Sequence, residues 1–179
     1  MKLTTSFLKK LNSYFLLVLI LYSYSAFSQI IITEIADPNN NSGADPRRYV
    51  EIYNSSSSSI SLTDYFLIRW TNGNPDPTNA NAIKLTTACG SSLAAKTFCI
   101  LSNDTTSNFK TDYGFVSDYN GGSGGPVDSN GDDNLAIVTQ SASSFDNNNS
   151  YTLIDVFGNA DTDGSGQWHE FEDGRAERK

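Results

Sequence analysis

The stretch that decides the fold reads Arg48-Tyr49-Val50-Glu51-Ile52-Tyr53-Asn54, then a serine-rich segment, then Ile60-Ser61-Leu62-Thr63-Asp64-Tyr65-Phe66-Leu67-Ile68-Arg69-Trp70. In its first half Val50 and Ile52 alternate with more polar side chains, which is the period-two pattern of a strand with one buried face. In its second half Phe66, Ile68 and Trp70 fall on one side of the chain. The pattern predicts a β-hairpin joined through residues 54–59, because Asn and Ser favour turns. The predicted structural residues are Val50, Ile52, Phe66, Ile68 and Trp70 in the core and Asn54 in the turn, where its side chain bonds nearby backbone.

Further strands are predicted on both sides of this stretch. Residues 30–35 form a β-branched run that Pro38 ends by removing a ladder donor. Downstream, short apolar or β-branched runs separated by turn clusters predict strands at 82–88, 97–103, 108–118, 135–139 and 151–157, followed by an extended piece that holds Trp168 and Phe171. No stretch after the leader has helical periodicity. Short strands at regular spacing predict an all-β, antiparallel β-sandwich in a single domain.

The first 28 residues have the three parts of a secretory signal peptide. Three lysines form a basic start, residues 14–22 form an apolar core, and small residues precede Gln29. We expect cleavage before Gln29, which leaves one domain over residues 29–179. A membrane anchor is the alternative, but the apolar run is shorter than the roughly 20 residues that a span needs. The leader therefore predicts a secreted or cell-surface protein whose mature form has no transmembrane span.

The mature domain is acidic. The whole chain has a net charge of −8, and removal of the three leader lysines, which no acid accompanies, makes it −11. Such a surface repels phosphate backbones and disfavours nucleic acid as a directly bound partner. The aromatic content of 12% favours a folded domain, because disordered chains are poor in aromatic residues.

The chain has two cysteines, Cys89 and Cys99. In an exported protein such a pair favours a disulfide, here between the end of one strand and the middle of the next. Two buried free thiols are the alternative. A zinc site is disfavoured, because His169 is distant in sequence and two thiols do not complete a tetrahedral shell.

The residues of the opening stretch also resemble a known family. The strand at 49–54, the turn at Asn54, and Leu62 and Tyr65-Phe66 before the next strand are similar to the core of the lamin tail domain. The strand at 32–35, the turn and strand at 93–101 and the ending at 164–176 resemble secreted bacterial members of that family. The resemblance implies an immunoglobulin-like sandwich. It also implies an association with secreted nucleases or phosphoesterases, for which such a domain serves as an accessory; this is an analogy at the level of the fold.

Two acidic loops are candidate calcium sites. Residues 128–134 offer alternating oxygen ligands, but the glycine falls at the wrong place for a helix-hand loop. The second set, Asp161, Asp163, Ser165 and Glu172 with Gly166, matches positions one, three, five, twelve and six of that loop. No helix flanks it, so a solvent-exposed loop is the favoured interpretation and calcium binding there is expected to be weak at most.

No catalytic constellation is evident in the sequence. The glycine run at 121–125 lacks the helix and the Gly-Lys-Ser/Thr ending of a phosphate cradle, and His169 has no nucleophile pattern near it. Glu170 and Glu172 are interpreted as surface acids. We therefore expect a secreted, non-catalytic binding or tethering module without a cofactor, whose partner is a protein, a glycan or another cell-surface ligand. The alternative is the accessory domain of a longer secreted nuclease or phosphoesterase.

Overall fold

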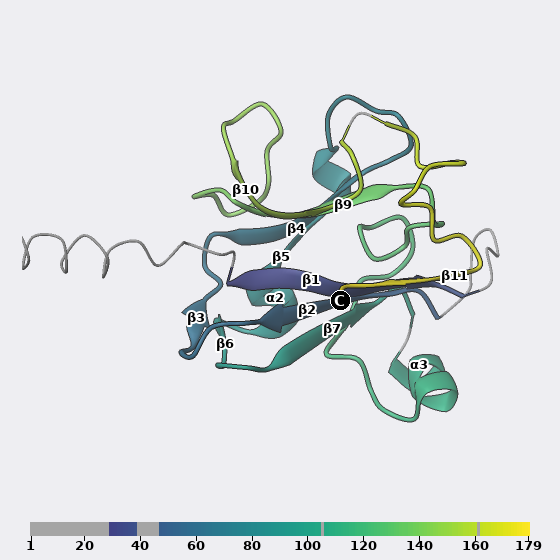
Figure 1. The fold of residues 1–179 in the computed structure, drawn as a ribbon. Coiled ribbons are helices and arrows are strands. Elements are labelled where there is room, and N and C mark those ends of the chain that lie inside the picture. The colour runs from purple at the N-terminus through teal and green to yellow at the C-terminus, as the bar shows by residue number, and fades with distance from the viewer. Residues whose placement is uncertain (1–28, 39–46, 105, 161) are drawn as a thin grey trace, which may run out of the picture.

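Two β-sheets face each other in the computed structural model, which describes residues 29–38, 47–104, 106–160 and 162–179 (Figure 1). The larger sheet has five strands in the order β11-β1-β2-β7-β8, and the smaller has four in the order β10-β9-β4-β5. The strands of the larger sheet are β1 (Ile30–Asp37), β2 (Tyr49–Asn54), β7 (Phe98–Ser102), β8 (Tyr119–Asn120) and β11 (Gly174–Glu177). Those of the smaller sheet are β4 (Tyr65–Trp70), β5 (Ala82–Lys84), β9 (Asn134–Thr139) and β10 (Thr152–Phe157). The predicted sandwich is confirmed, with one parallel pair, β7 with β8.

The predicted hairpin is wrong. β2 pairs with β1 and β7, whereas β4 pairs with β5 and β9, so the two strands lie in opposite sheets (Figure 1). The connection between them contains β3 (Ile60–Ser61), which pairs with β6 (Ser92–Leu93) in a ribbon at one end of the sandwich. β2 and β4 each have two neighbours in their own sheets, so neither has a free edge for pairing with the other.

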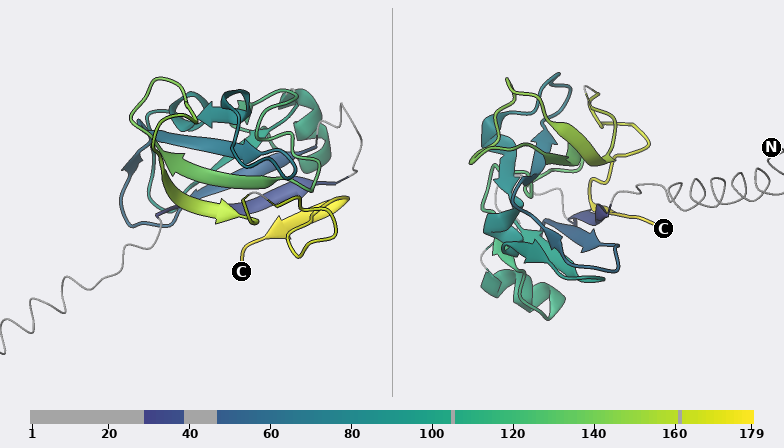
Figure 2. Two further views of the ribbon diagram at one scale, coloured as in Figure 1. Left: turned by 90° about the horizontal axis from the view of Figure 1, so that it is seen from above. Right: turned by 90° about the vertical axis from the view of Figure 1, so that its left-hand side faces the viewer.

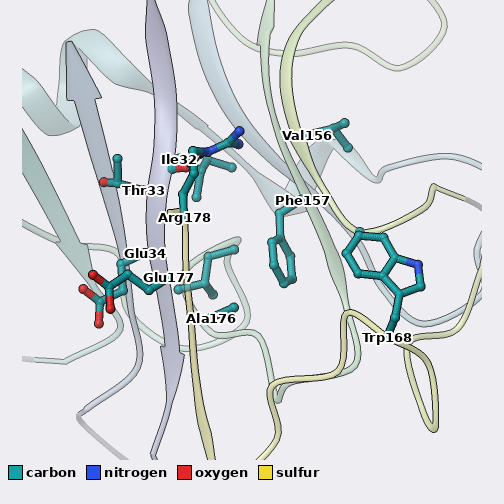
Figure 3. Close-up of a pocket in the computed structure, with 11 residues that line it drawn as sticks. Ile32, Thr33, Glu34, Val156, Phe157, Trp168, Ala176, Glu177 and Arg178 are labelled. Carbon is teal, nitrogen blue, oxygen red and sulfur yellow. Dashed lines mark hydrogen bonds between the residues drawn. The ribbon is translucent and has the colours of Figure 1, made fainter. Parts of the chain in front are cut away.

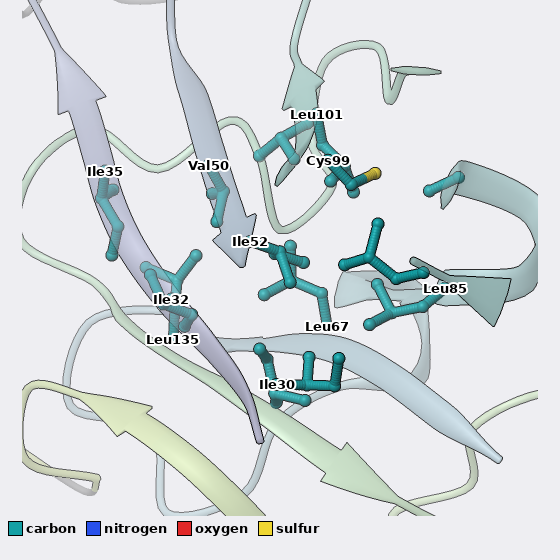
Figure 4. Close-up of a cluster of buried hydrophobic side chains, with 14 of the residues drawn as sticks. Ile30, Ile32, Ile35, Val50, Ile52, Leu67, Leu85, Cys99, Leu101 and Leu135 are labelled. Carbon is teal, nitrogen blue, oxygen red and sulfur yellow. The ribbon is translucent and has the colours of Figure 1, made fainter. Parts of the chain in front are cut away.

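The main core fills the space between the sheets. Val50 and Ile52 from one sheet and Leu67 and Leu135 from the other are buried together there (Figure 4). Figure 2 shows the two layers from other directions. Burial of this apolar surface is the main favourable contribution to folding.

β4 is buried on both of its faces. Phe66, Ile68 and Trp70 do not face the main core but a second cluster, which Phe145 completes. Leu67, which alternates with the residues predicted for the core, is the β4 residue that packs between the sheets. Phe145 comes from the segment between β9 and β10, so both faces of β4 have apolar neighbours. The alternation in β4 therefore could not show which face meets the other sheet.

Two helices stand where strands were predicted. β5 ends at Lys84 and α2 (Leu85–Cys89) follows, because Leu85 and Ala88 are three residues apart and bury one helical face. α3 (Thr106–Tyr113) replaces most of the predicted strand at 108–118. Phe109 and Tyr113 are four residues apart and pack together against Tyr49. A short 3-10 helix, η1 (Asn79–Asn81), precedes β5.

The C-terminal segment differs from the predicted extended piece. Trp168 lies in a turn, Phe171 directly precedes another turn, and the strand, β11, follows at residues 174–177. β11 pairs antiparallel with the second half of β1. The leader and its predicted cleavage lie outside the described residues. Within the described ranges, no helix is long and apolar enough to cross a membrane.

Candidate binding site

A pocket of about 220 Å³ opens where the edges of the two sheets meet. Its walls come from three segments that are distant in sequence: β1, the end of β10, and the C-terminal segment with Trp168 and β11 (Figure 3). Pairing of β11 with β1 places Ala176 beside Ile35, and β10 brings Phe157 to the opposite wall. The lining is predominantly apolar, as in most ligand-binding pockets.

Trp168 forms the rim of the pocket. Its side chain is 78% exposed, the most exposed of the large hydrophobic residues in the described part of the chain. Trp168 and Phe157 both line the pocket (Figure 3). A tryptophan side chain that stays exposed to water does not contribute the large stabilisation that its burial would give. Tryptophan is also enriched at sites where partners bind. The pocket can therefore accept an apolar group against an aromatic wall.

Arg178, one of the residues that line the pocket, forms an ion pair with Asp155. Arg178 donates two hydrogen bonds of 2.8 Å from Nη2 to the Asp155 carboxylate, and its Nε donates to the Ile32 carbonyl. The Ile32 amide in turn donates to Asp155 Oδ2 at 2.7 Å. Burial raises the pKa of Asp155, although Ile32 and Arg178 both oppose this change. These bonds satisfy the backbone amide and carbonyl of Ile32, which lies outside the part of β1 that pairs with β11.

His169 lies behind the aromatic wall. It is 2% exposed, and its ring centroid is 6.4 Å from that of Phe157 and 5.0 Å from that of Trp168. Neither ring nitrogen has a hydrogen-bond partner among the described residues, and burial lowers the pKa of the imidazole. Gly158, at φ +92°, makes room for this packing, since a Cβ there would lie 2.1 Å from Asn134 Oδ1 and 3.0 Å from the His169 ring.

The described calcium candidates do not converge. Asp163 Oδ1 accepts a hydrogen bond from the Ser165 amide, as in a local turn. Glu172 packs instead against Gly131, where a Cβ would lie 2.4 Å from the Glu172 backbone. Asp161 lies outside the described residues. Among the residues that are described, no group of three or more His, Cys, Asp or Glu side chains is placed to hold a metal ion.

The other acidic loop, residues 128–134, is tied to two buried arginines. Asp128 pairs with Arg48 at 3.1 Å, and its carbonyl accepts a 2.7 Å bond from Arg69. Asp133 pairs with Arg69 at 3.1 Å, and both of these side chains are buried. Arg48 lies beside the larger sheet and Arg69 belongs to the smaller, so this loop binds the two layers together. The Asp128 and Asp133 carboxylates are therefore engaged in structural ion pairs, and Asp132 Oδ2 accepts a hydrogen bond from the Asn72 side chain.

The remaining sequence candidates are structural as well. The predicted disulfide is present and joins Cys89, at the end of α2 rather than of a strand, to Cys99 in β7. In the glycine run, the Gly122 and Gly124 amides donate to Asn120 and Asp128, so they bond side chains of the same loop. Asn54 is buried, and its amide donates to the carbonyls of Ser58, Leu93 and Ala94.

Sequence reasoning did not find the pocket. Its parts are separated by more than a hundred residues, as the Ile32–Asp155 and Ile32–Arg178 bonds show. The one signal in the sequence was Trp168, a large apolar residue in a polar, glycine-rich context. Tryptophan is enriched among the residues that dominate binding interfaces.

The comparison with curated proteins and the comparison with solved structures each found no match. The family model described as Lamin Tail Domain matches residues 23–167, which is most of the chain. That span contains both sheets except β11, together with the β10 wall of the pocket. The chain belongs to the lamin tail domain family.

Proposed function

We propose that this protein is an exported, non-catalytic binding module whose ligand enters the pocket beside Trp168. The observation that carries the proposal is an exposed tryptophan at the rim of a pocket with apolar walls. Export is supported by the signal-peptide pattern of residues 1–28 and by the disulfide, since disulfides persist in oxidising compartments. The same role would serve a free-standing secreted protein or the accessory domain of a longer secreted hydrolase.

The test is binding by the secreted protein to arrays of glycans and of peptides. Trp168→Ala should lose about 2 kcal/mol or more of binding free energy, which is roughly thirtyfold in Kd, as buried aromatic anchors do. Phe98→Ala is the matched control, because Phe98 is 52% exposed but lies in β7 and does not line the pocket. Binding that survives Trp168→Ala unchanged would show that the ligand site is elsewhere.

Two further measurements test the other parts of the proposal. N-terminal sequencing of the exported protein should begin at Gln29, and recovery of the intact leader would contradict export with cleavage. The purified protein should not hydrolyse bis(p-nitrophenyl) phosphate. Turnover of that substrate would contradict the non-catalytic assignment and favour a phosphoesterase.

A further inference from the structure

β11 is an edge strand whose outer backbone groups have no partner among the described residues. It ends the five-stranded sheet and pairs only with β1. The Arg178 amide donates to the Thr33 carbonyl, which places the backbone groups of alternate residues, Ala176 and Arg178, on the β1 side. The backbone groups of Arg175 and Glu177 therefore point to the free edge. An unpaired edge of this kind is a template for another strand.

The pocket lies along this free edge. It is lined by Ala176 and Arg178 on one side and by Phe157 and Trp168 on the other (Figure 3). In a sheet, residues directly opposite each other have side chains on the same face. The Ala176 side chain packs toward the main core. A residue placed opposite Ala176 on an added strand would consequently direct its own side chain into the pocket.

The size of the pocket fits one side chain. Its volume of about 220 Å³ is below the roughly 300 to 1,000 Å³ of sites that enclose a whole small molecule. Backbone pairing with a pocket for an alternate side chain is a known mode of peptide recognition.

The charge around β11 favours a basic partner. Between Trp168 and Lys179 the chain carries four acids, Glu170, Glu172, Asp173 and Glu177, and three bases, of which Arg175 already pairs with Glu34 and Arg178 with Asp155. The pKa of Glu172 is raised by burial and by its acidic neighbours, foremost Glu170, which indicates a negative potential beside the strand. Complementary charge speeds association and selects partners.

Resting on the proposed function, we infer that the ligand is an extended, lysine- or arginine-bearing polypeptide segment that pairs with the free edge of β11. The segment hydrogen-bonds to the backbone of Arg175 and Glu177 and places one apolar side chain between Ala176 and Trp168. The site thus recognises a protein partner by strand addition.

The experiment uses the secreted protein and a nine-residue peptide of alternating lysine and threonine with a central leucine in place of one threonine. Calorimetry should detect binding, and exchange of the lysines for glutamates should weaken it at least about tenfold, a difference of about 1.4 kcal/mol. N-methylation of the two residues that flank the leucine removes the backbone donors and should cause a similar loss. No detectable binding of the lysine peptide at millimolar concentration, or equal binding of the N-methylated peptide, would overturn the inference.

The matched protein variants are Glu177→Pro and Glu177→Ala. Proline removes the free-edge amide, which is tolerated on edge strands, whereas alanine keeps it. Only the proline variant should lose about tenfold or more in affinity, and equal affinities of the two would contradict strand addition. Thermal unfolding checks that both variants fold, and the N-methylated peptide tests the same bond in the unaltered protein. If binding on the arrays depends on Trp168 but neither N-methylation of the peptide nor Glu177→Pro weakens binding, the proposed function stands and strand addition is wrong.

Discussion

At the scale of single residues, Ile52 shows how strongly this fold depends on its core. It lies in the centre of β2, completely buried between the sheets. Replacement by alanine should cost about 2 to 5 kcal/mol, through lost burial and the cavity left behind. Urea unfolding measures this directly, with Phe98→Ala as a surface control in the neighbouring strand β7. An unchanged urea midpoint in Ile52→Ala would mean that the register of β2 is wrong by one residue.

His169 gives the protein a pH dependence at the same scale. Burial lowers its pKa below the ordinary value of 6.5, so the unfolded chain takes up a proton at a higher pH than the folded protein does. The free energy of unfolding should therefore fall as pH drops below about 6.5 and level off beneath the folded pKa. The raised pKa values of Asp132 and Asp155 act in the opposite direction, because the folded state protonates these groups first.

The measurement is urea unfolding of wild type and His169→Phe at pH 7.5 and 5.5. The carboxylate contribution is common to both proteins, so the difference between their pH dependences isolates His169. Wild type should lose more stability on acidification than the variant. Equal losses would show that the imidazole is solvated in the folded protein.

At the scale of elements, Asn54 connects three segments. Its amide donates to carbonyls of the 55–59 segment and of the segment that begins with β6, and its Oδ1 accepts a bond from the Ser56 amide. Asn54→Ala leaves these buried groups without partners, at a cost of about 1 to 3 kcal/mol for each that water cannot reach. Asn54→Asp is the informative companion, since it keeps the acceptor and loses the donors. Denaturation of both should show a large loss, and a loss below about 0.5 kcal/mol would indicate that water replaces the bonds.

At the scale of the whole molecule, Arg69 and Asp133 hold the loop of residues 128–134 against the smaller sheet. Both side chains are buried. Asp133→Ala alone should cost about 3 to 5 kcal/mol, because it leaves a buried guanidinium uncompensated. Arg69→Ala/Asp133→Ala should cost less than the sum of the two single variants. Additive losses in denaturant unfolding would mean that the pair is not coupled.

The disulfide acts at the same scale, since it fastens α2, which follows the smaller sheet, to β7 in the larger one. A double Cys89→Ala/Cys99→Ala variant should lose about 2 to 3 kcal/mol by the chain-entropy estimate for so short a loop. Mass spectrometry of the purified wild type should find no free thiol. Alkylation of both cysteines under native conditions would contradict the bond.

Local pattern was sufficient for much of this fold. The alternation around Val50 and Ile52, the stop at Pro38 and the turn at Asn54 depend on neighbours within a few residues, and each predicts the observed local structure. Local pattern failed at α2 and α3. Each of these helices has only a few apolar residues three or four apart, and their β-branched and aromatic neighbours favour a strand prediction.

Composition, period-two alternation and local motifs in the sequence were sufficient to predict an acidic all-β domain with a cysteine pair and its resemblance to the lamin tail domain family, to which the chain belongs. The three-dimensional fold was needed to show that β2 and β4 lie in opposite sheets and that Leu67 faces the main core. It alone brought β1, β10 and Trp168 together around one pocket. Strand pairing depends on which faces become buried and which strand edges are free across the whole chain. A period-two pattern shows that a strand has two different faces, but it does not show which strand is its partner.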